Sequence, residues 1–556
     1  MKTENALNPD GFKIHPLQLV FPTIFICVLS LSLPVLTLQV YDRILPNPES
    51  GTLPILIMGV CVAVCLEAGL RLTRAYVLGW SGAAYEHKMS CAAIKHVLSA
   101  DLAALNKDGS GENLNRMSAI SKLREFKNGY NIVTYTELAF IALYLGLIAY
   151  IAGWLVLVPV VILCAFTIIS VFMGSWLNRS LKARDEADDH RYNFLIESLQ
   201  GVHTIKAFSL EKPFLRRYEN IQSDATIANY SVTEATANTF NLATVFAHIM
   251  LASVITFGAW QVLQGNMTSG GLIASILLSG RVMQPVQRAL GLWTRYQDYQ
   301  IAAEKVEQIF ALPVMRHQDI LKEDVSRDGS LILRDVEFTG LFSNVDLDLK
   351  IGESIQITGP TGSGKTTLLK MMAGLYQVDG GDIEVDGYAP TDYKPQELMK
   401  HIGYMPTLGT IFRGRIRDNL TCFGTIPEDQ VRVISAMLGI DQDVARLPRG
   451  FDTWMEGMEQ DTVPPGLRQR IALARVLAAH PRIILFDNAD RNLDREGYRQ
   501  IHTMLGRLKD KVALIMVTED QNLSRLADRR MVLTSGGLRE VQVNNEVISM
   551  FKELRA

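Results

Sequence analysis

The chain has 556 residues, 48% of them hydrophobic, and its 55 basic and 58 acidic residues leave a formal net charge of −3. This length predicts more than one domain, because single hydrophobic cores stop growing at about 250–300 residues. The balanced charge lacks the basic excess that is typical of nucleic-acid-binding proteins, so nucleic acid is not expected as a partner.

The first half of the chain is predicted to be a membrane α-helical bundle. Six apolar stretches are each close to the roughly 20 residues that a helix needs to cross a bilayer. They are Leu17–Val40, Leu53–Leu72, Val133–Gly153, Trp154–Met173, Phe240–Leu263 and Gly271–Trp293. The transmembrane domain is therefore placed at residues 1–293, with the membrane as its first predicted partner.

Two long charged segments, which follow the second and fourth spans, indicate the orientation. Both are rich in Lys and Arg, whereas the short joins between the other spans offer only Arg43. The positive-inside rule then places both segments and both termini in the cytoplasm. Helical periodicity predicts that the membrane helices continue beyond the bilayer as stalks. The glycine-rich residues Lys107–Gly111 are expected to form a turn at a stalk tip.

Four ionisable residues lie at membrane depth, namely Glu67, Glu137, His248 and Arg281. Each would be costly against lipid, so each is expected to face the bundle interior or a water-filled cavity. They could line a substrate path, or they could be polar residues that are paired inside the bundle or lie near helix ends. The second interpretation is favoured for Glu67 and Glu137, and neither is favoured for His248 and Arg281.

The composition changes between residues 294 and 330, which look like a charged helical connector followed by a loop. From Leu331 the pattern becomes short strands, glycine turns and amphipathic helices. This pattern predicts an α/β domain at residues 331–556.

A glycine-rich segment in this second half has the spacing of a phosphate-binding P-loop. It follows the apolar stretch Ile355–Thr358 and consists of Gly359, Pro360, Thr361, Gly362, Ser363, Gly364, Lys365, Thr366 and Thr367. Its backbone N–H groups can surround an anion at the positive end of the following helix. Lys365 is expected to reach the β- and γ-phosphates and the Thr366 hydroxyl to coordinate Mg²⁺. The alternative is a glycine-rich turn without a ligand.

Asp487 is the second predicted element of the nucleotide site. It ends the apolar run Ile483–Phe486, and downstream of a P-loop such a strand places its acid to hold Mg²⁺, directly or through water. The predicted cofactors are therefore ATP and Mg²⁺, with Thr366 and Asp487 as metal ligands. A buried strand that ends in Asp by chance is the alternative.

Further stretches become informative when they are taken together with the spans and the P-loop. They are Val40–Asn47 (VYDRILPN), Gly280–Pro285 (GRVMQP), Leu312–Pro313, Leu447–Thr453 (LPRGFDT) and Arg468–Arg475 (RQRIALAR). Over nearly its whole length the chain resembles ABC exporter half-transporters, and more narrowly the ATPase subunits of bacterial type I secretion systems. The resemblance implies the ABC type I exporter fold, in the bacterial inner (cytoplasmic) membrane with the nucleotide-binding domain in the cytoplasm.

The resemblance also implies partners. In this family two nucleotide domains enclose two ATP molecules, each between the P-loop of one chain and the Leu-Ser-Gly-Gly-Gln signature of the other. A second ABC half-transporter is therefore expected, with a heterodimer favoured and a homodimer possible. The cargo implied is a protein or peptide, passed to a periplasmic adaptor and an outer-membrane channel.

The sequence departs from the family pattern at its catalytic positions. It has Val463-Pro464-Pro465-Gly466-Leu467 at the signature, Asn488 at the catalytic Glu position, Glu519 at the switch His position, Thr407 at the Q-loop Gln position and Gly340 near the expected adenine-stacking aromatic. Asn488 cannot take a proton from water, and the prolines donate no N–H to a phosphate. No catalytic residue is intact, so the chain is predicted to hold ATP without hydrolysing it.

Three alternatives remain open at this level. The chain could be a membrane-embedded ATP-binding scaffold or regulator that transports nothing. It could be a homodimeric exporter in which Glu459, Glu519 or another acid has become the general base. It could also be the product of a decaying gene, against which stand the intact spans, Lys365 and Asp494.

Overall fold

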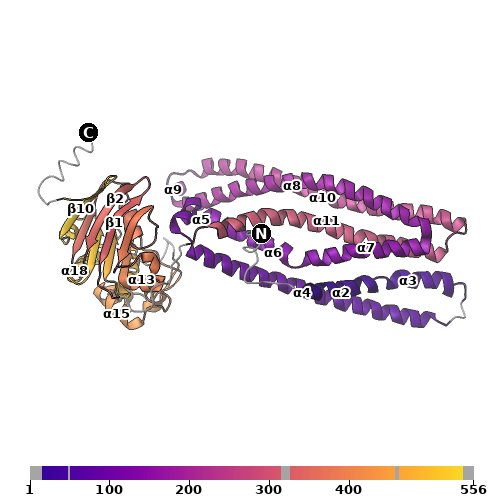
Figure 1. Cartoon of the computed structure of the whole chain (residues 1–556), viewed down its shortest axis with the longest axis horizontal. Coiled ribbons are helices and arrows are strands. Elements are labelled where there is room, and N and C mark those ends of the chain that lie inside the picture. Colours follow the sequence, from indigo (N-terminus) through magenta and orange to yellow (C-terminus); the bar gives the residue numbers. More distant parts are fainter. Residues whose placement is uncertain (1–14, 48–50, 315–325, 458–462, 542–556) are drawn as a thin grey trace. The chain divides into compact units, whose positions relative to one another are not determined.

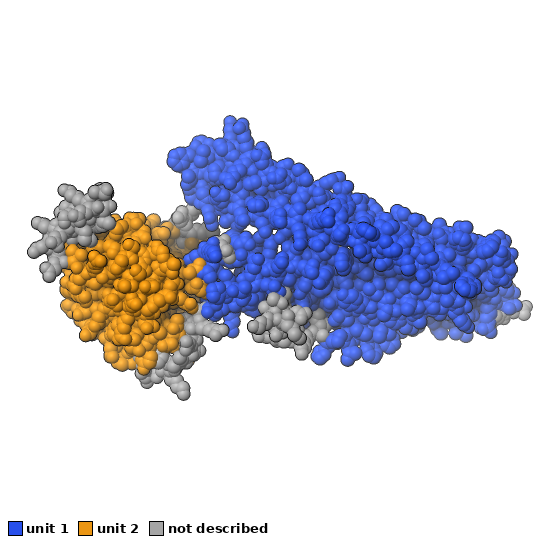
Figure 2. All heavy atoms as spheres, turned by 45° about the horizontal axis from the view of Figure 1, so that its top comes forward, with its two compact units in different colours: residues 1–100, 104–314 blue, residues 101–103, 315–556 orange. Residues whose placement is uncertain are grey.

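The computed structural model describes residues 15–47, 51–314, 326–457 and 463–541. It divides into two compact units, which Figure 2 colours separately: residues 1–100 with 104–314, and residues 101–103 with 315–556. The division at residue 314 falls inside the predicted connector.

The first unit is built from long helices that lie alongside one another (Figure 1). The elements are α2 (Pro16–Leu29), α3 (Ser32–Gln39), η2 (Val40–Ile44), α4 (Leu53–Ser99), α5 (Leu102–Ser118), α6 (Ile120–Lys127), α7 (Tyr130–Ala152), η4 (Gly153–Val156), α8 (Leu157–Gln200), α9 (Val202–Ala207), α10 (Glu211–Leu263) and α11 (Ser269–Ala311). Helix α8 packs against α10, α7 against α11, and α2 against α4. Buried side chains between α7, α8, α10 and α11 form the core, among them Tyr144, Phe166, Met250 and Val282.

The helices are much longer than a bilayer requires. Helices α4, α8, α10 and α11 have 47, 44, 53 and 43 residues. At a rise of about 1.5 Å per residue each extends over roughly 65–80 Å, about twice the thickness of a hydrocarbon core. The predicted continuation of the membrane helices beyond the bilayer is therefore present in the structure.

Four helical runs in the described residues are long and apolar enough to cross a membrane: Pro16–Ile44, Leu53–Ser99, Gly111–Gln200 and Glu211–Leu263. They contain five of the six predicted spans, because Gly111–Gln200 includes both α7 and α8, which are joined by the turn at Gly153. The sixth predicted span lies on α11, which is not among the four. The count of six spans therefore stays a prediction.

The expected turn at Lys107–Gly111 is wrong, because these residues lie inside helix α5. The chain turns instead at Ala100–Asp101, between α4 and α5. Glycine is a poor helix former, but tertiary packing overrides this preference. A Cβ at Gly111 would lie 2.9 Å from Ile196 Cδ1, so the glycine lets α5 approach α8 closely.

The π-helical turn η2 contains Asp42, which caps the N-terminus of α11. The Asp42 carboxylate accepts hydrogen bonds from the Gly270 N–H (3.0 Å) and the Thr268 hydroxyl (2.7 Å). Thr268 Oγ1 accepts in turn from the Gly271 N–H (3.0 Å). A negative charge at a helix N-terminus is also favoured by the helix dipole. The segment Val40–Asn47 thus fixes the end of one helix onto the start of another.

Replacing Asp42 by Ala is expected to lower the free energy of unfolding by about 1–2 kcal/mol, because the Gly270 N–H and the Thr268 hydroxyl lose their acceptor at the start of α11. Asp42→Asn keeps a carbonyl acceptor and should lose less. Thermal unfolding of the purified protein in detergent measures the difference. Equal midpoints for wild type and Asp42→Ala would contradict a stabilising cap.

The second unit is an α/β domain around a six-stranded sheet in the order β11-β10-β3-β9-β8-β5. Its strands are β3 (Ser354–Thr358), β5 (Ile402–Met405), β8 (Ile483–Asp487), β9 (Ala513–Val517), β10 (Arg529–Thr534) and β11 (Gly537–Glu540). Strands β10, β3, β9, β8 and β5 are parallel, and β11 is antiparallel to β10. The carboxyl ends of the parallel strands therefore share one edge, where α/β proteins bind ligands.

A three-stranded antiparallel sheet in the order β2-β1-β4 and a two-stranded β6-β7 sheet complete the strands of the described domain. Their bounds are β1 (Leu331–Phe338), β2 (Phe342–Leu349), β4 (Gly380–Val385), β6 (Gly414–Arg415) and β7 (Trp454–Met455). The helices are α12 (Lys365–Met372), η5 (Pro390–Asp392), α13 (Pro395–His401), α14 (Ile416–Leu420), α15 (Glu428–Met437), α16 (Ile440–Val444), η6 (Gly450–Asp452), α17 (Pro465–Ala478), α18 (Arg495–Leu508) and α19 (Gln521–Ser524). Two buried apolar clusters share the central sheet as a common wall.

Candidate nucleotide site

The P-loop connects β3 to α12, as the sequence predicts. Gly359 and Gly364 have positive φ angles, of 151° and 90°. A Cβ at Gly359 would lie 2.5 Å from Leu533 O, and one at Gly364 would lie 2.8 Å from Phe342 Cε1. Glycine is thus needed at both positions for the conformation and for the close packing. The loop leads into the first turn of α12, whose N–H groups have no partner within the helix.

Lys365, the first residue of α12, lies over its own loop. Its Nζ donates to the carbonyl oxygens of Gly359 (2.9 Å) and Pro360 (2.8 Å). Burial lowers the pKa of Lys365, and Arg491 lowers it further, while the carboxylates of Glu519 and Asp487 act in the opposite direction. The Lys365 ammonium also donates to the Ser363 hydroxyl (3.5 Å). A desolvated ammonium that holds only uncharged oxygens is well suited to bind phosphate oxygens in their place.

Asp487 ends β8 and is 1% exposed. Thr366 Oγ1 donates to its Oδ1 (3.1 Å), and the Tyr404 hydroxyl donates to its Oδ2 (2.8 Å). Burial and the neighbouring Asp487 carboxylate raise the pKa of Tyr404, so its hydroxyl stays protonated and remains a donor. The structure therefore brings the two predicted metal ligands into contact and adds Tyr404, for which the sequence had suggested no role.

The residues present fit a magnesium ion that is shared with phosphate. Among the residues that the structure describes, no group of three or more His, Cys, Asp or Glu is placed to hold a metal ion. The donors here are one hydroxyl (Thr366) and one carboxylate (Asp487). Mg²⁺ is commonly held by one or two such groups together with water and substrate phosphates.

The groups at the catalytic positions have structural partners. Asn488 follows Asp487 with φ 47°, a conformation that asparagine tolerates better than most residues, and its N–H donates to Val517 O (2.7 Å). The Thr407 hydroxyl donates to Asp487 O (2.8 Å), and the Asn492 amide donates to Thr407 O (3.0 Å). These contacts hold the end of β8 and supply no proton acceptor for a water molecule.

Glu519, at the expected switch position, forms an ion pair with Arg491. Arg491 Nη2 lies 2.8 Å from Glu519 Oε1, and the side chains are 52% and 82% exposed. The carboxylate oxygen that faces the guanidinium therefore already has a donor. Glu459, the other acid considered as a replacement base, lies outside the described residues.

The signature region begins helix α17. Pro464 occupies the N-cap position and Pro465 the first helical position, without a side-chain cap. Gln469 on this helix is 3% exposed; its carbonyl accepts from the Gly409 N–H (2.7 Å) and its amide donates to Ala489 O (3.2 Å). Gln469 thereby ties α17 to the segments that follow β5 and β8. The stretch Arg468–Arg475 contains Gln469, but the sequence did not indicate this linking role.

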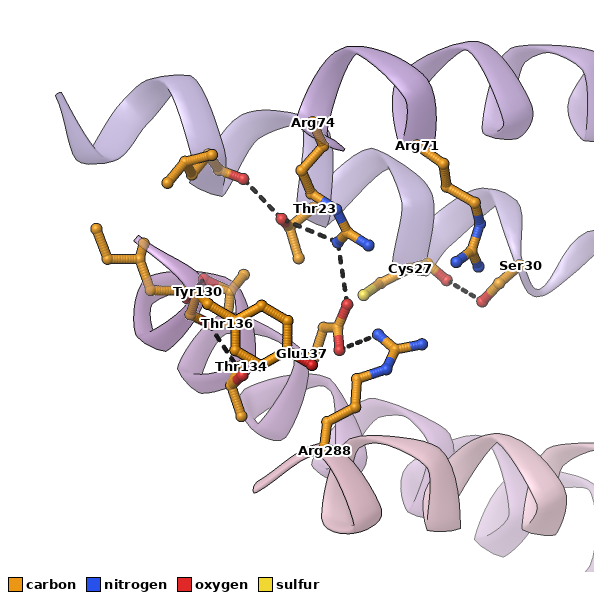
Figure 3. A network of polar contacts seen from close by, with 12 residues as sticks. Thr23, Cys27, Ser30, Arg71, Arg74, Tyr130, Thr134, Thr136, Glu137 and Arg288 are labelled. Carbon is orange, nitrogen blue, oxygen red and sulfur yellow. Dashed lines mark hydrogen bonds and ion pairs between the residues drawn. The ribbon is translucent and has the colours of Figure 1, made fainter. Parts of the chain in front are cut away.

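The membrane helices hold a separate polar network around Glu137 (Figure 3). Glu137 on α7 is 3% exposed and forms ion pairs with Arg74 on α4 (3.0 Å) and Arg288 on α11. Arg74 also donates to Thr23 on α2 (3.4 Å). Glu67 pairs with Arg71 one turn along α4 (2.5 Å). Both glutamates are thus paired, which is one of the two arrangements in the favoured interpretation.

His248 lines a cavity of about 230 Å³ between α10 and α11, together with Ser279, Gln284 and Gln287. Arg281 is half-buried and does not line this cavity. The cavity contains polar side chains at membrane depth, which is compatible with a substrate path and with a packing defect. A substrate path at His248 therefore stays a prediction.

Comparison with protein families gives two matches. The model for the ABC transporter transmembrane region matches residues 17–286, and the ABC transporter model matches residues 342–491. The second range begins in β2 and includes the P-loop and Asp487.

Similar proteins include three ATP-binding proteins that are named for translocation or secretion. The chain is 25% identical over 539 residues to the exotoxin translocation ATP-binding protein PaxB of Pasteurella aerogenes, with 96% of this chain and 75% of that protein covered. It is 26% identical over 521 residues to the cyclolysin secretion/processing ATP-binding protein CyaB of Bordetella pertussis (92% and 73% covered). It is 25% identical over 539 residues to the leukotoxin translocation ATP-binding protein LktB of Mannheimia haemolytica (96% and 76%).

Among solved structures, a bacterial Atm1-family ABC exporter with ATP bound matches over 97% of both chains, with a TM-score of 0.80 and 18% sequence identity. At this identity the match supports the fold, a membrane helical bundle with an attached ABC ATPase domain. The predicted fold class is thereby confirmed.

Proposed function

This chain belongs to the ABC transporter family and resembles type I secretion exporters, and from that premise we propose that it is an exporter subunit that binds Mg²⁺-ATP without hydrolysing it in its own site. The observation that carries the proposal is a contrast, at one edge of the sheet, between residues that suit nucleotide binding and residues that do not suit hydrolysis. The contacts of Lys365, Thr366 and Asp487 suit a nucleotide, which supports the proposal. Asn488 and Glu519 stand at the predicted positions of the general base and the switch, and Glu519 is paired with Arg491.

The size of the catalytic loss supports this proposal. Loss of a general base commonly lowers a rate by about 10²–10⁴-fold. Loss of one transition-state donor lowers it by about 10²–10³-fold. These effects do not add within one catalytic unit, but either is enough to make turnover slow. ATP held in such a site would act as a structural ligand that stabilises the domain.

The signature region supports a heterodimer over a homodimer. Two copies of this chain would pair each P-loop with a signature that starts at Pro464 and Pro465, where proline offers no N–H to a phosphate. A complete half-transporter would supply one intact signature to this P-loop. We therefore favour such a partner, in the bacterial inner membrane, with a protein or peptide cargo, a periplasmic adaptor and an outer-membrane channel.

The proposal predicts that the purified chain in lipid nanodiscs releases phosphate from ATP no faster than its Lys365→Ala variant, while only the wild type retains ATP. Phosphate release and retention of labelled ATP are measured on the same samples. Turnover that Lys365→Ala abolishes would refute the proposal and support a homodimeric exporter.

Whether the chain takes part in cargo transport is tested by a separate measurement of export. In cells, export that fails in Lys365→Ala would support an exporter subunit. Export that is unaffected by this variant would support a membrane-embedded ATP-binding scaffold or regulator instead.

A further inference from the structure

Four charged residues lie at or just after the ends of three adjacent strands of the central sheet: Lys365, Asp487, Arg491 and Glu519. Strand β9 lies between β3 and β8, with Ile355 beside Ile515 and Asp487 beside Val517. Adjacent strands are about 4.8 Å apart, so residues that follow the ends of these three strands lie within roughly 10 Å across the sheet. The P-loop follows β3, Asn488 follows β8, and Glu519 follows β9 by one residue, Thr518.

Hydrogen bonds fix the strand ends that carry the Arg491–Glu519 pair. Thr518 O accepts from Gln356 Nε2 on β3 (3.1 Å), which ties the end of β9 to the strand before the P-loop. The Thr518 hydroxyl donates to Asp490 (3.3 Å), and the Arg491 N–H donates to Asn488 O (3.3 Å) in the turn after β8. Arg491 and Glu519 therefore extend from anchored backbone, although their side chains are solvent-exposed.

The pair lies at the same sheet edge as the lysine of the P-loop. Arg491 and Glu519 follow the ends of β8 and β9, and β9 lies next to β3, the strand that leads to Lys365. Glu519 alone would repel the phosphate that Lys365 is placed to bind. Arg491 neutralises this carboxylate and has further N–H donors on its guanidinium beyond the one that faces Glu519, because arginine carries five. These donors are free to bind a phosphate oxygen while Glu519 holds the guanidinium in place.

We propose that Arg491, positioned by Glu519, binds the terminal phosphate and makes this site prefer a nucleoside triphosphate over a diphosphate. The inference deepens the proposed function and rests on ATP being held at the P-loop. In chemical terms, a site without a general base has in addition the permanently charged guanidinium of Arg491. A guanidinium binds phosphate through charge-assisted hydrogen bonds but takes no proton from water, so it favours binding and not hydrolysis.

The test compares MgATP and MgADP binding to the full chain in nanodiscs. For Arg491→Ala we expect the affinity for MgATP to fall by about tenfold, the effect of losing one charge-assisted interaction, with MgADP changed by less than about threefold. Arg491→Lys should recover part of the loss. Glu519→Gln keeps a side-chain oxygen that can accept from Arg491 and removes only the negative charge, so it should not weaken MgATP binding. Arg495→Ala is the matched control, an exposed arginine that starts α18.

The outcomes separate this inference from the proposed function. Equal losses for MgATP and MgADP in Arg491→Ala, or no loss for either, would overturn the role of Arg491 while leaving ATP binding in place. Wild type that binds MgATP no better than Lys365→Ala would overturn both. The thermal midpoint of each variant without nucleotide shows whether a loss comes from misfolding.

Discussion

Replacing Lys365 by Ala is expected to lower the affinity for ATP by about 100-fold, because the lysine would supply charge-assisted hydrogen bonds to two phosphates. Its ammonium now donates to the carbonyl oxygens of Gly359 and Pro360 and to the Ser363 hydroxyl, all uncharged, so phosphate binding replaces weak partners by strong ones. Thermal unfolding with and without MgATP measures the effect. A ligand at 100 times its Kd stabilises the folded state by about 2.7 kcal/mol, so the wild type should gain several degrees, whereas the variant, with ATP then at its Kd, should gain only about 0.4 kcal/mol.

Lys370→Ala is the matched control for this experiment. Lys370 lies on the same helix, α12, with its ammonium 5.5 Å from the Tyr376 ring centroid and away from the loop carbonyls. Loss of ATP stabilisation in both variants would point to damage of α12 and not to a specific role of Lys365. Undiminished ATP stabilisation in Lys365→Ala would contradict the assignment of the phosphate site.

Replacing Glu137 by Ala is expected to destabilise the membrane bundle by about 3–5 kcal/mol, because removal of one partner leaves buried charges without compensation. Arg74 is 11% exposed, and with Arg288 it converges on the Glu137 carboxylate from two other helices (Figure 3). The variant would leave two positive charges facing each other. The thermal midpoint of the purified protein in detergent measures the loss, and Glu137→Gln, which keeps hydrogen-bonding capacity, should lie between wild type and Ala.

Glu67→Ala provides the comparison. Its partner Arg71 lies on the same helix and is 38% exposed, so the pair links no two helices. We expect a loss of about 0–1 kcal/mol, as for other accessible ion pairs. If the two Ala variants lose the same stability, the Glu137 network has no special role in holding the four helices together.

The local parts of the nucleotide site were predictable from the sequence. A P-loop is one continuous segment whose glycines, lysine and threonine act through backbone conformation and a helix end, so nine consecutive residues define it. The contact between Thr366 and Asp487 followed from the same motif, because Asp487 ends a strand downstream of the P-loop. The departures at Asn488, Glu519 and Thr407 could likewise be located by their positions relative to motifs.

The partners of those residues were not predictable from the sequence. Arg491 and Glu519 are separated by helix α18 and strand β9, and only the strand order places their side chains together. Tyr404 reaches Asp487 because β5 lies beside β8. In the membrane unit, Glu137 was expected to lie near a helix end or to be paired inside the bundle, but its partners come from α4 and α11 and depend on how the helices pack. The helix at Lys107–Gly111 was mispredicted because its packing partner, Ile196, is distant in sequence.

The sequence by itself determined that this protein has apolar helices long enough to span a membrane and a P-loop, and it predicted a magnesium-binding acid and an altered set of catalytic residues. These are properties of residue type and short spacing, which act within a few residues of chain. Only the tertiary structure decided which charges neutralise one another and which helix is capped by Asp42. Such contacts depend on strand order and helix packing, because Coulomb and hydrogen-bond energies fall with distance in space and not along the chain.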